Sequence, residues 1–302
     1  EAHGVALQLN EHVRGAPITG ARVTATSRIA IALGVVGGHY ETANVLLAPI
    51  EAASDLIDKE PAARAFLQAA NVARAAWEPD LDRAVQQAEE AIKSFEIVGD
   101  VRNATRQRQK SGTALAELGA YVESEAMLNR ARHDAELLGL ASVANDATLR
   151  LTFVFARIGR FAEASAFANE LIQAYSANRD RGGEAHARCY LASVYYYESR
   201  FEDAAVESAR ALALIDHSPP YRAALLGFFS LTKMHQGAPP AEVLAMAKEA
   251  YDLLEQLRGI AEGEAVVRIG YAEALAYAGQ QDAAKAAVAT ARDRLLARAS
   301  TA

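Results

Sequence analysis

The stretch GAYVES at residues 119–124 places a small residue two positions before an aromatic one, and this pattern recurs along the chain. Close copies are GHYETA at 38–43 and GRFAEA at 159–164, and looser copies are PDLDRA at 79–84, SRFEDA at 199–204 and GQQDAA at 279–284. With Pro239 in a degenerate copy, the third positions are residues 40, 81, 121, 161, 201, 239 and 281, which lie 38 to 42 residues apart. A fixed period in this range predicts a solenoid of repeated units.

Helical patterns fill the intervals between these turns. A second set of breakers separates one repeat from the next, because glycine can end a helix in the left-handed conformation and proline can begin one. These breakers are Pro61, Gly99, Gly139, Gly182 with Gly183, Pro219 with Pro220, and Gly259. The expected first helices cover residues 24–37, 64–77, 105–118, 146–158, 184–198, 222–236 and 262–278, and the second helices cover 41–57, 81–97, 122–138, 162–177, 202–216, 240–257 and 281–298.

Residues 1–302 are expected to form one array. Its repeats would cover residues 21–60, 61–100, 101–140, 141–181, 182–218, 219–259 and 260–302, after a partial repeat and turn at 1–20. Residues 2–14 also have a helical pattern, and they fall where the second helix of an earlier repeat would lie. We therefore expect this chain to be cut from a longer protein.

Composition supports a folded helical protein. The 302 residues are 51% hydrophobic and 23% charged with only eight prolines, which is outside the range of disordered chains. The net charge of −7 gives no electrostatic footprint for nucleic acid. No apolar run is long enough to span a membrane. The single cysteine, Cys189, excludes an internal disulfide and fits a reducing compartment, so a cytoplasmic location is expected.

The turns, together with small residues at fixed positions between them, resemble the tetratricopeptide repeat family. In that family a small residue near the middle of the first helix and another in the second helix allow close packing. The first position holds Ile31, Val72, Gly112, Thr152, Ala192, Ser230 and Ala272, and the second holds Ala43, Ala84, Ser124, Ala164, Ala204, Glu242 and Ala284. The resemblance implies an all-α, right-handed superhelical solenoid of antiparallel helix pairs, with about seven repeats plus a partial N-terminal one.

This sequence departs from the family pattern in two ways. Its repeats are close to forty residues long, whereas the common repeat has about 34. The sixth repeat has Pro239 at the aromatic position and Glu242 at the small one, so a different packing is expected there. Longer repeats of this kind look similar to the arrays of bacterial signalling ATPases, transcription activators and Ser/Thr kinases.

The resemblance also implies a concave groove lined by the first helices. In the third to fifth repeats the groove positions carry cations and aromatics, a composition typical of binding hot spots. Arginine also pairs well with carboxylate and phosphate groups. In the second repeat these positions are blander and include Phe66 and Ala69. The expected partner-binding residues are Arg106, Gln109, Lys110, Arg150, Phe153, Arg157, His186, Tyr190, Ser193, Tyr196 and Tyr197.

A plainer interpretation of the same residues stays open. Arginine on a helix often only faces solvent, and aromatic residues at helical spacing often belong to the core. Tyr195, Tyr196 and Tyr197 spread over about 200° of a helix, at roughly 100° per residue. We expect Tyr195 to be the one in the core, but a register shift of one residue would exchange core and groove positions.

The sequence predicts no enzyme, no cofactor and no metal site. The seven histidines are scattered, without a His-Glu-x-x-His motif or a Cys/His metal spacing. His186 and Cys189 are three residues apart, but no third group would orient them for catalysis. The carboxylate clamp of the resembled family needs Lys and Asn at two first-helix positions. Here those positions hold pairs such as Arg28 with Ala32 and Gln109 with Thr113, so the clamp is absent.

The expected function is that of a protein–protein interaction scaffold within a larger bacterial signalling or regulatory protein. It would bind a peptide or a neighbouring domain in its concave groove, and the partner would be acidic with apolar anchors. The alternative is a ligand-sensing regulatory domain, responding to a small molecule or a signal peptide and attached to a kinase, ATPase or transcription activator. That alternative needs a closed pocket in place of an open groove. The oligomeric state is left open.

Overall fold

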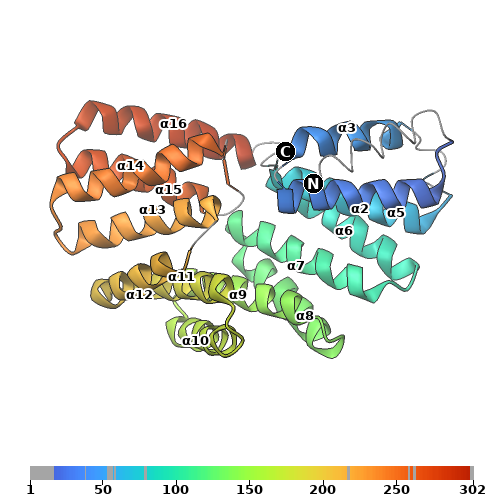
Figure 1. The fold of residues 1–302 in the computed structure, drawn as a ribbon, viewed down its shortest axis with the longest axis horizontal. Helices are drawn as coiled ribbons and strands as arrows, with labels where there is room; N and C mark the ends of the chain where they lie inside the picture. The colour runs from blue at the N-terminus through green and yellow to red at the C-terminus, as the bar shows by residue number, and fades with distance from the viewer. Residues whose placement is uncertain are drawn as a thin grey trace. The chain divides into compact units, whose positions relative to one another are not determined.

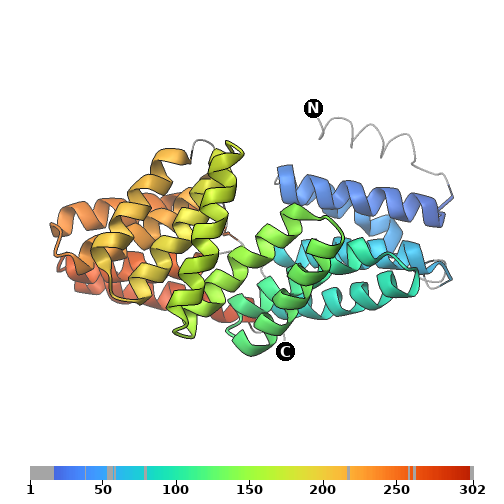
Figure 2. The same cartoon turned by 90° about the horizontal axis from the view of Figure 1, so that it is seen from below.

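The computed structural model describes residues 17–37, 39–52, 57, 59–77, 80–215, 218–257, 259–260 and 263–299. In this described part the fold is all-α, with fourteen helices that pack as sequential antiparallel pairs (Figure 1, Figure 2). This confirms the predicted fold class. The helix predicted over residues 2–14 lies outside the described residues. Among the described helices, none is long and apolar enough to cross a membrane.

Each pair consists of a first helix and a second helix. The first helices are α2 (Gly20–Gly37), α5 (Pro61–Trp77), α7 (Val101–Glu117), α9 (Ala141–Arg157), α11 (Arg181–Tyr197), α13 (Pro219–His235) and α15 (Glu264–Tyr277). The second helices are α3 (Tyr40–Glu51), α6 (Leu81–Ile97), α8 (Tyr121–Leu137), α10 (Phe161–Ala177), α12 (Phe201–Leu214), α14 (Pro240–Gln256) and α16 (Gln281–Ala299).

Most first helices begin several residues earlier than the sequence pattern predicted. Aspartates supply the reason at two of these starts, because a carboxylate can accept the free N–H groups of a first turn. Asp100 accepts from Asn103 N at 3.0 Å, and Asp180 accepts from Gly183 N at 2.9 Å. The prediction of a break at Gly182 and Gly183 was therefore wrong, since both residues lie in the first turn of α11.

A recurring turn sets the forty-residue period. The six helices from α6 to α11 are each 17 residues long, and a three-residue turn follows each of them. Each turn holds one residue in the left-handed conformation: Gly99, Gly119, Gly139, Gly159, Arg179 and Ser199. The next amide donates to the carbonyl five residues back, as from Arg160 N to Phe155 O at 2.8 Å. This is the Schellman closure of a helix end, and two such helix-plus-turn segments make one repeat.

The helices group into two compact units, residues 1–144 (unit 1) and 145–300 (unit 2), with the boundary inside α9. In unit 1, α2 packs on α3 and α5, α5 packs on α6, α6 on α7, and α7 on α8. In unit 2, α10 packs on α11 and α11 on α12, the order continues to α16, and α13 also packs on α15. A single array over residues 1–302 stays a prediction.

Small residues at the predicted positions let the paired helices approach closely. A Cβ added at Gly112 of α7 would lie 2.6 Å from Cγ of Leu128 on α8, which is too close for any side chain. The hydroxyl of Ser124 donates to the carbonyl of Gly112 at 2.7 Å across the same contact. Glycine at 112 and a small polar residue at 124 therefore fix the separation of α7 and α8.

The sixth repeat packs with its register moved by one residue. Glu242 is exposed, and Val243 occupies the buried small position with 1% of its surface accessible. Pro239 is the residue before α14 and is not in its first turn, so the helix begins at Pro240. Because the buried position is the fourth residue of the helix, a start one residue later moves it from 242 to 243.

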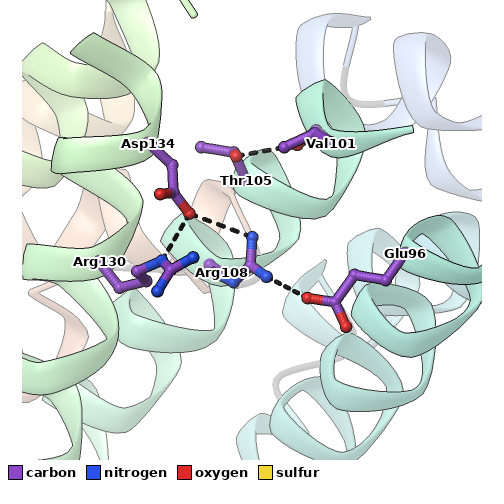
Figure 3. A network of polar contacts seen from close by, with 6 residues as sticks. All are labelled: Glu96, Val101, Thr105, Arg108, Arg130 and Asp134. Carbon is purple, nitrogen blue, oxygen red and sulfur yellow. Dashed lines mark hydrogen bonds and ion pairs between the residues drawn. The ribbon is translucent and has the colours of Figure 1, made fainter. Parts of the chain in front are cut away.

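An arginine connects three consecutive helices of unit 1. Arg108 extends from α7 between Asp134 of α8 and Glu96 of α6 (Figure 3). Its Nη1 lies 3.4 Å from Asp134 Oδ2, and Arg130 Nε lies 2.8 Å from the same oxygen. The Arg108 side chain is largely buried, so removing either partner would leave charge without compensation in a desolvated place.

We predict opposite effects from exchanging glycine and serine at equivalent turns of unit 2. A left-handed conformation costs a non-glycine residue roughly 1–2 kcal/mol, which the greater freedom of glycine in the unfolded chain partly offsets. Ser199→Gly should therefore raise the free energy of unfolding by about 0.5–1 kcal/mol, and Gly159→Ser should lower it by a similar amount. Urea denaturation followed by circular dichroism measures both. Equal stability of Gly159→Ser and wild type would contradict the turn argument.

We predict that Gly112→Val destabilises unit 1 by about 1–3 kcal/mol, because its side chain must displace buried Leu128. The matched control is Gly182→Val in the first turn of α11, where an added Cβ meets only Asp180 Oδ1 at 3.7 Å. The control should change stability by no more than about 0.5 kcal/mol. Thermal and urea unfolding of both variants test the pair, and similar losses at the two positions would show that α7 and α8 are not in tight contact.

Candidate functional site

The predicted partner-binding residues lie on first helices of both units. Arg106, Gln109 and Lys110 are on α7 in unit 1, and the other eight are on α9 and α11 in unit 2. Arg106 and Lys110 of the first group border a pocket, and most of the second group belongs to a set of aromatic and cationic contacts.

Unit 1 contains a pocket of about 440 Å³ between α2, α5, α6 and α7. Its apolar side is formed by Ile31, Phe66, Ala69 and Phe95. The rings of Phe66 and Phe95 meet edge to face with centroids 5.1 Å apart, a favourable geometry that fixes the exposed part of Phe66. The pocket therefore offers a rigid aromatic surface, and its volume lies within the range of small-molecule sites.

The polar side of the pocket consists of three cations, two amides and one carboxylate: Arg28, Arg106, Lys110, Asn103, Gln107 and Asp100. The guanidinium carbon of Arg28 lies 5.9 Å from the centroid of the Phe66 ring. The one carboxylate, Asp100, already accepts from the backbone and side-chain amides of Asn103, at 3.0 and 2.6 Å. Arg106 Nη1 donates to Asn103 Oδ1 at 3.3 Å.

Lys110 is half-buried in this pocket. Burial, together with the positive charge of Arg106 one turn earlier on α7, lowers the pKa of its ammonium group to about 8. Among the described residues, no hydrogen bond or ion pair reaches Lys110 Nζ. Since residues four apart share a helix face, Arg106 and Lys110 place two like charges side by side.

Gln107 is a buried amide on the same pocket wall. Only 4% of its surface is accessible, and its Oε1 makes no hydrogen bond with the part of the chain that the structure describes. Burying an amide without a hydrogen bond costs on the order of 1–3 kcal/mol. Gln109 does not line the pocket, and its Nε2 donates instead to Thr113 Oγ1 on the same helix, at 3.1 Å.

Two of the predicted partner-binding residues in unit 2, Arg150 and Ser193, are buried and form hydrogen bonds with a third, Tyr190. Arg150 is 6% exposed, donates from Nη1 to the hydroxyl of Tyr190, and has its guanidinium carbon 5.4 Å from that ring. Ser193 is also buried, and its hydroxyl donates to the carbonyl of Tyr190 at 2.7 Å. On the other side of Tyr190, His186 lies with its ring 5.2 Å away and a second contact to Tyr221 at 4.2 Å.

The remaining residues form what we call the aromatic cluster: Arg157, Tyr196, Tyr197, Phe201, Phe228 and His235. Arg157 Nη1 donates to the hydroxyl of Tyr197 at 2.7 Å, with its guanidinium carbon 5.1 Å from the ring. Tyr196 meets Phe228 edge to face at 5.4 Å. His235 stacks on Phe201 at 4.6 Å. These contacts connect α9, α11, α12 and α13 within unit 2.

Tyr196 is the centre of the cluster. Its hydroxyl lies 3.2 Å from Nε2 of His235, and its ring contacts Tyr197, Phe201 and Phe228. Burial raises the pKa of Tyr196, and the negative charge of Glu273 on α15 raises it further. The phenol therefore stays protonated at neutral pH and keeps its capacity to donate a hydrogen bond. Phe153, half-buried on α9, makes no ring or polar contact within the described residues.

Sequence reasoning missed several members of both surfaces. It did not single out Arg28 or Gln107 in unit 1, nor Tyr221, Phe228 or His235 in unit 2. For unit 2 the signal was present in the repeat period. The bonded pairs Arg150 with Tyr190, Arg157 with Tyr197, and Tyr196 with His235 are 40, 40 and 39 residues apart. Equivalent positions of adjacent first helices therefore touch.

Nothing in the described residues assembles three or more histidine, cysteine, aspartate or glutamate side chains into a group that could hold a metal ion. The arrangement is one of hydrogen-bond donors, cations and aromatic faces. These groups can bind a ligand or a partner.

Neither a protein-family model nor a curated protein matches the chain. Among solved structures, it is similar to BtubC (BKLC) from P. vanneervenii, with a TM-score of 0.50 and 16% identity over 72% of this chain and 91% of that one. It is also similar to a Signal Transduction ATPase with Numerous Domains (STAND) protein with a tetratricopeptide repeat sensor, from Pyrococcus horikoshii. Here the TM-score is 0.59 and the identity 15%, over 83% of this chain and 39% of that one. In fold, the chain is an all-helical, tetratricopeptide-like repeat array.

Proposed function

We propose that the chain is a protein-interaction module of a larger bacterial signalling or regulatory protein, binding a peptide or a neighbouring domain along its first helices. The observation that supports this proposal most directly is the aromatic cluster of unit 2. Three first helices, α9, α11 and α13, contribute side chains to it, so it extends over several repeats. Surfaces of this kind suit an elongated partner.

The chemistry of the cluster supports the same proposal. Arginine and tyrosine are enriched among the residues that dominate binding energy, because each offers a large flat surface together with hydrogen-bond donors. Arg157 and His235 are exposed, and Tyr196 and Tyr197 are partly exposed. Their mutual contacts hold them in place, so little side-chain entropy is lost when a partner binds.

The charges indicate what the partner would carry. Of the two arginines predicted to bind in unit 2, Arg150 is buried against Tyr190 whereas Arg157 is exposed. A partner would therefore place apolar or aromatic side chains on the tyrosines and a carboxylate near Arg157. This corresponds to an acidic peptide with apolar anchors.

The second candidate function is ligand sensing on behalf of an attached kinase, ATPase or transcription activator. The pocket of unit 1 favours it, because its volume lies within the range of small-molecule sites. The fold similarity to a STAND protein whose repeats are described as a sensor is compatible with this role. The two functions do not exclude each other, since the pocket and the cluster belong to different units.

The partner surface is tested by affinity capture from a lysate of the source cells, with bound proteins identified by mass spectrometry. The test variant combines Arg157→Glu with Tyr197→Ala. The matched control combines Arg292→Glu with Val288→Ala, both exposed on the second helix α16. We expect the test variant to lose the partner, with affinity for the purified protein falling at least about tenfold, while the control retains it.

Circular dichroism and thermal unfolding establish that both variants are folded. Capture of the same proteins by wild type, test variant and control would contradict a partner surface at the cluster. Equal loss of the captured proteins in the test variant and the control would also contradict it, because a charge reversal on α16, outside the cluster, should not affect binding.

A further inference from the structure

The pocket of unit 1 contains more positive charge than its surroundings neutralise. Arg28, Arg106 and Lys110 line it, against the single carboxylate of Asp100. Asp100 is engaged at the start of α7, where it accepts two hydrogen bonds from Asn103. Salt bridges elsewhere in unit 1, such as Arg74 with Glu51, show that this unit pairs other cations directly. The pocket therefore presents a net charge of about +2 to a ligand.

Gln107 provides a second, independent observation. Its side chain is more than nine-tenths buried, lines the pocket, and its Oε1 makes no hydrogen bond within the described residues. No hydrogen bond fixes which end of the amide faces the pocket. The amide can therefore turn to offer either the oxygen or the N–H group. With the N–H group turned toward the pocket, Gln107 becomes a donor beside the three cations. An anion in the pocket can accept a hydrogen bond from this N–H group.

The apolar side of the pocket lies opposite these donors. Phe66 is fixed by its edge-to-face contact with Phe95, and Ile31 and Ala69 extend the apolar surface. A ligand that used only the charged side would leave this surface in contact with water. Burying it adds about 25 cal/mol for every Å² removed from water. The pocket thus favours a molecule with a charged end and an apolar body.

We propose that this pocket binds a small organic anion, whose phosphate or carboxylate group contacts Arg28, Arg106, Lys110 and Gln107 and whose apolar body packs on Phe66. The net charge of the pocket matches a dianion better than a monoanion, so a phosphate monoester should bind more tightly than a carboxylate of the same size. The site lies in unit 1 and does not depend on the aromatic cluster of unit 2. This proposal rests on the second candidate function, ligand sensing at this pocket, whereas the partner-binding proposal can fail without it.

Isothermal titration of the full chain with four simple probes tests the chemistry. Phenyl phosphate has both the dianion and the ring, phenylacetate has a monoanion and the ring, inorganic phosphate lacks the ring, and benzyl alcohol lacks the charge. We expect one site in unit 1, with the affinity decreasing in that order. If phenylacetate binds as tightly as phenyl phosphate, the anion site stands and the preference for a dianion is refuted. If benzyl alcohol binds as tightly as phenyl phosphate, or neither anion binds, the proposal is refuted.

Matched variants locate the site. The test variant combines Arg106→Gln with Lys110→Gln, and the control combines Arg102→Gln with Lys93→Gln, which removes the same charge from exposed positions on α7 and α6. We expect the test variant to bind phenyl phosphate at least about tenfold more weakly, and the control to bind it as wild type does. The test variant should remain folded, because its substitutions remove a repulsion between like charges. Equal affinities in the two variants would place the anion elsewhere.

The pH dependence of binding gives an independent readout. The charged groups lining the pocket around Lys110 are Arg106 from α7, Asp100 immediately before α7, and Arg28 from α2. Helices α5 and α6 contribute apolar side chains, and α8 lines no part of the pocket. Lys110 loses its proton as the pH rises through about 8, and an anion binds the protonated form. Affinity for phenyl phosphate should therefore fall between pH 7.5 and 9.5, by at least about threefold. Lys110→Arg, which stays charged, should bind without this fall, and the same fall in that variant would contradict a contact with Lys110.

Discussion

The turn that ends each helix sets the geometry on which the rest of the structure depends. One residue takes the left-handed conformation, and the next amide reaches back five residues to a helix carbonyl. From α6 to α11 each helix has 17 residues, so a helix and its turn span twenty residues and two of them make a repeat of forty. A given side chain therefore meets its counterpart one repeat later. The contacts of Arg150 with Tyr190 and of Arg157 with Tyr197 are direct consequences of that spacing.

The same regular packing does not restrict which side chain occupies each position of the first helices. On α9 and α11, equivalent positions carry an arginine and then a tyrosine, so the cations of unit 2 interact with aromatic partners from the same chain. On α2, α5 and α7 the corresponding surface combines Arg28, Phe66 and Arg106, with no second carboxylate beside Asp100. Arg150 and Arg157 of unit 2 thus contact tyrosines of the same chain, whereas three cations and one carboxylate line the pocket of unit 1. One architecture yields an aromatic surface in one unit and a cationic pocket in the other.

Charge also stabilises the packing of the helices away from these surfaces. In unit 2, fully buried Glu264 binds Arg268 at 2.7 Å, and Arg268 also binds Glu255 at 2.9 Å, which connects α14 with α15. In unit 1, Arg108 has the same function between α6 and α8. Buried pairs of this kind contribute little net stability against apolar residues of the same shape, but removing one partner costs several kcal/mol. They penalise any helix register other than the native one.

The sequence by itself determined the fold class, the helix pairs and the period, because these follow from local preferences: glycine at left-handed turns, small residues at close contacts, and apolar periodicity in between. It also singled out Arg106 and Lys110, which line the pocket, and Arg157, Tyr196 and Tyr197, which belong to the cluster; their role in binding stays a proposal. It could not place Gln107 or His235, nor show that Arg150 is buried. Those outcomes depend on which side chain of the neighbouring helix stands opposite, and a contact between residues forty positions apart is decided only when the helices pack. Whether a cation meets a tyrosine or faces a pocket was therefore settled by the tertiary structure.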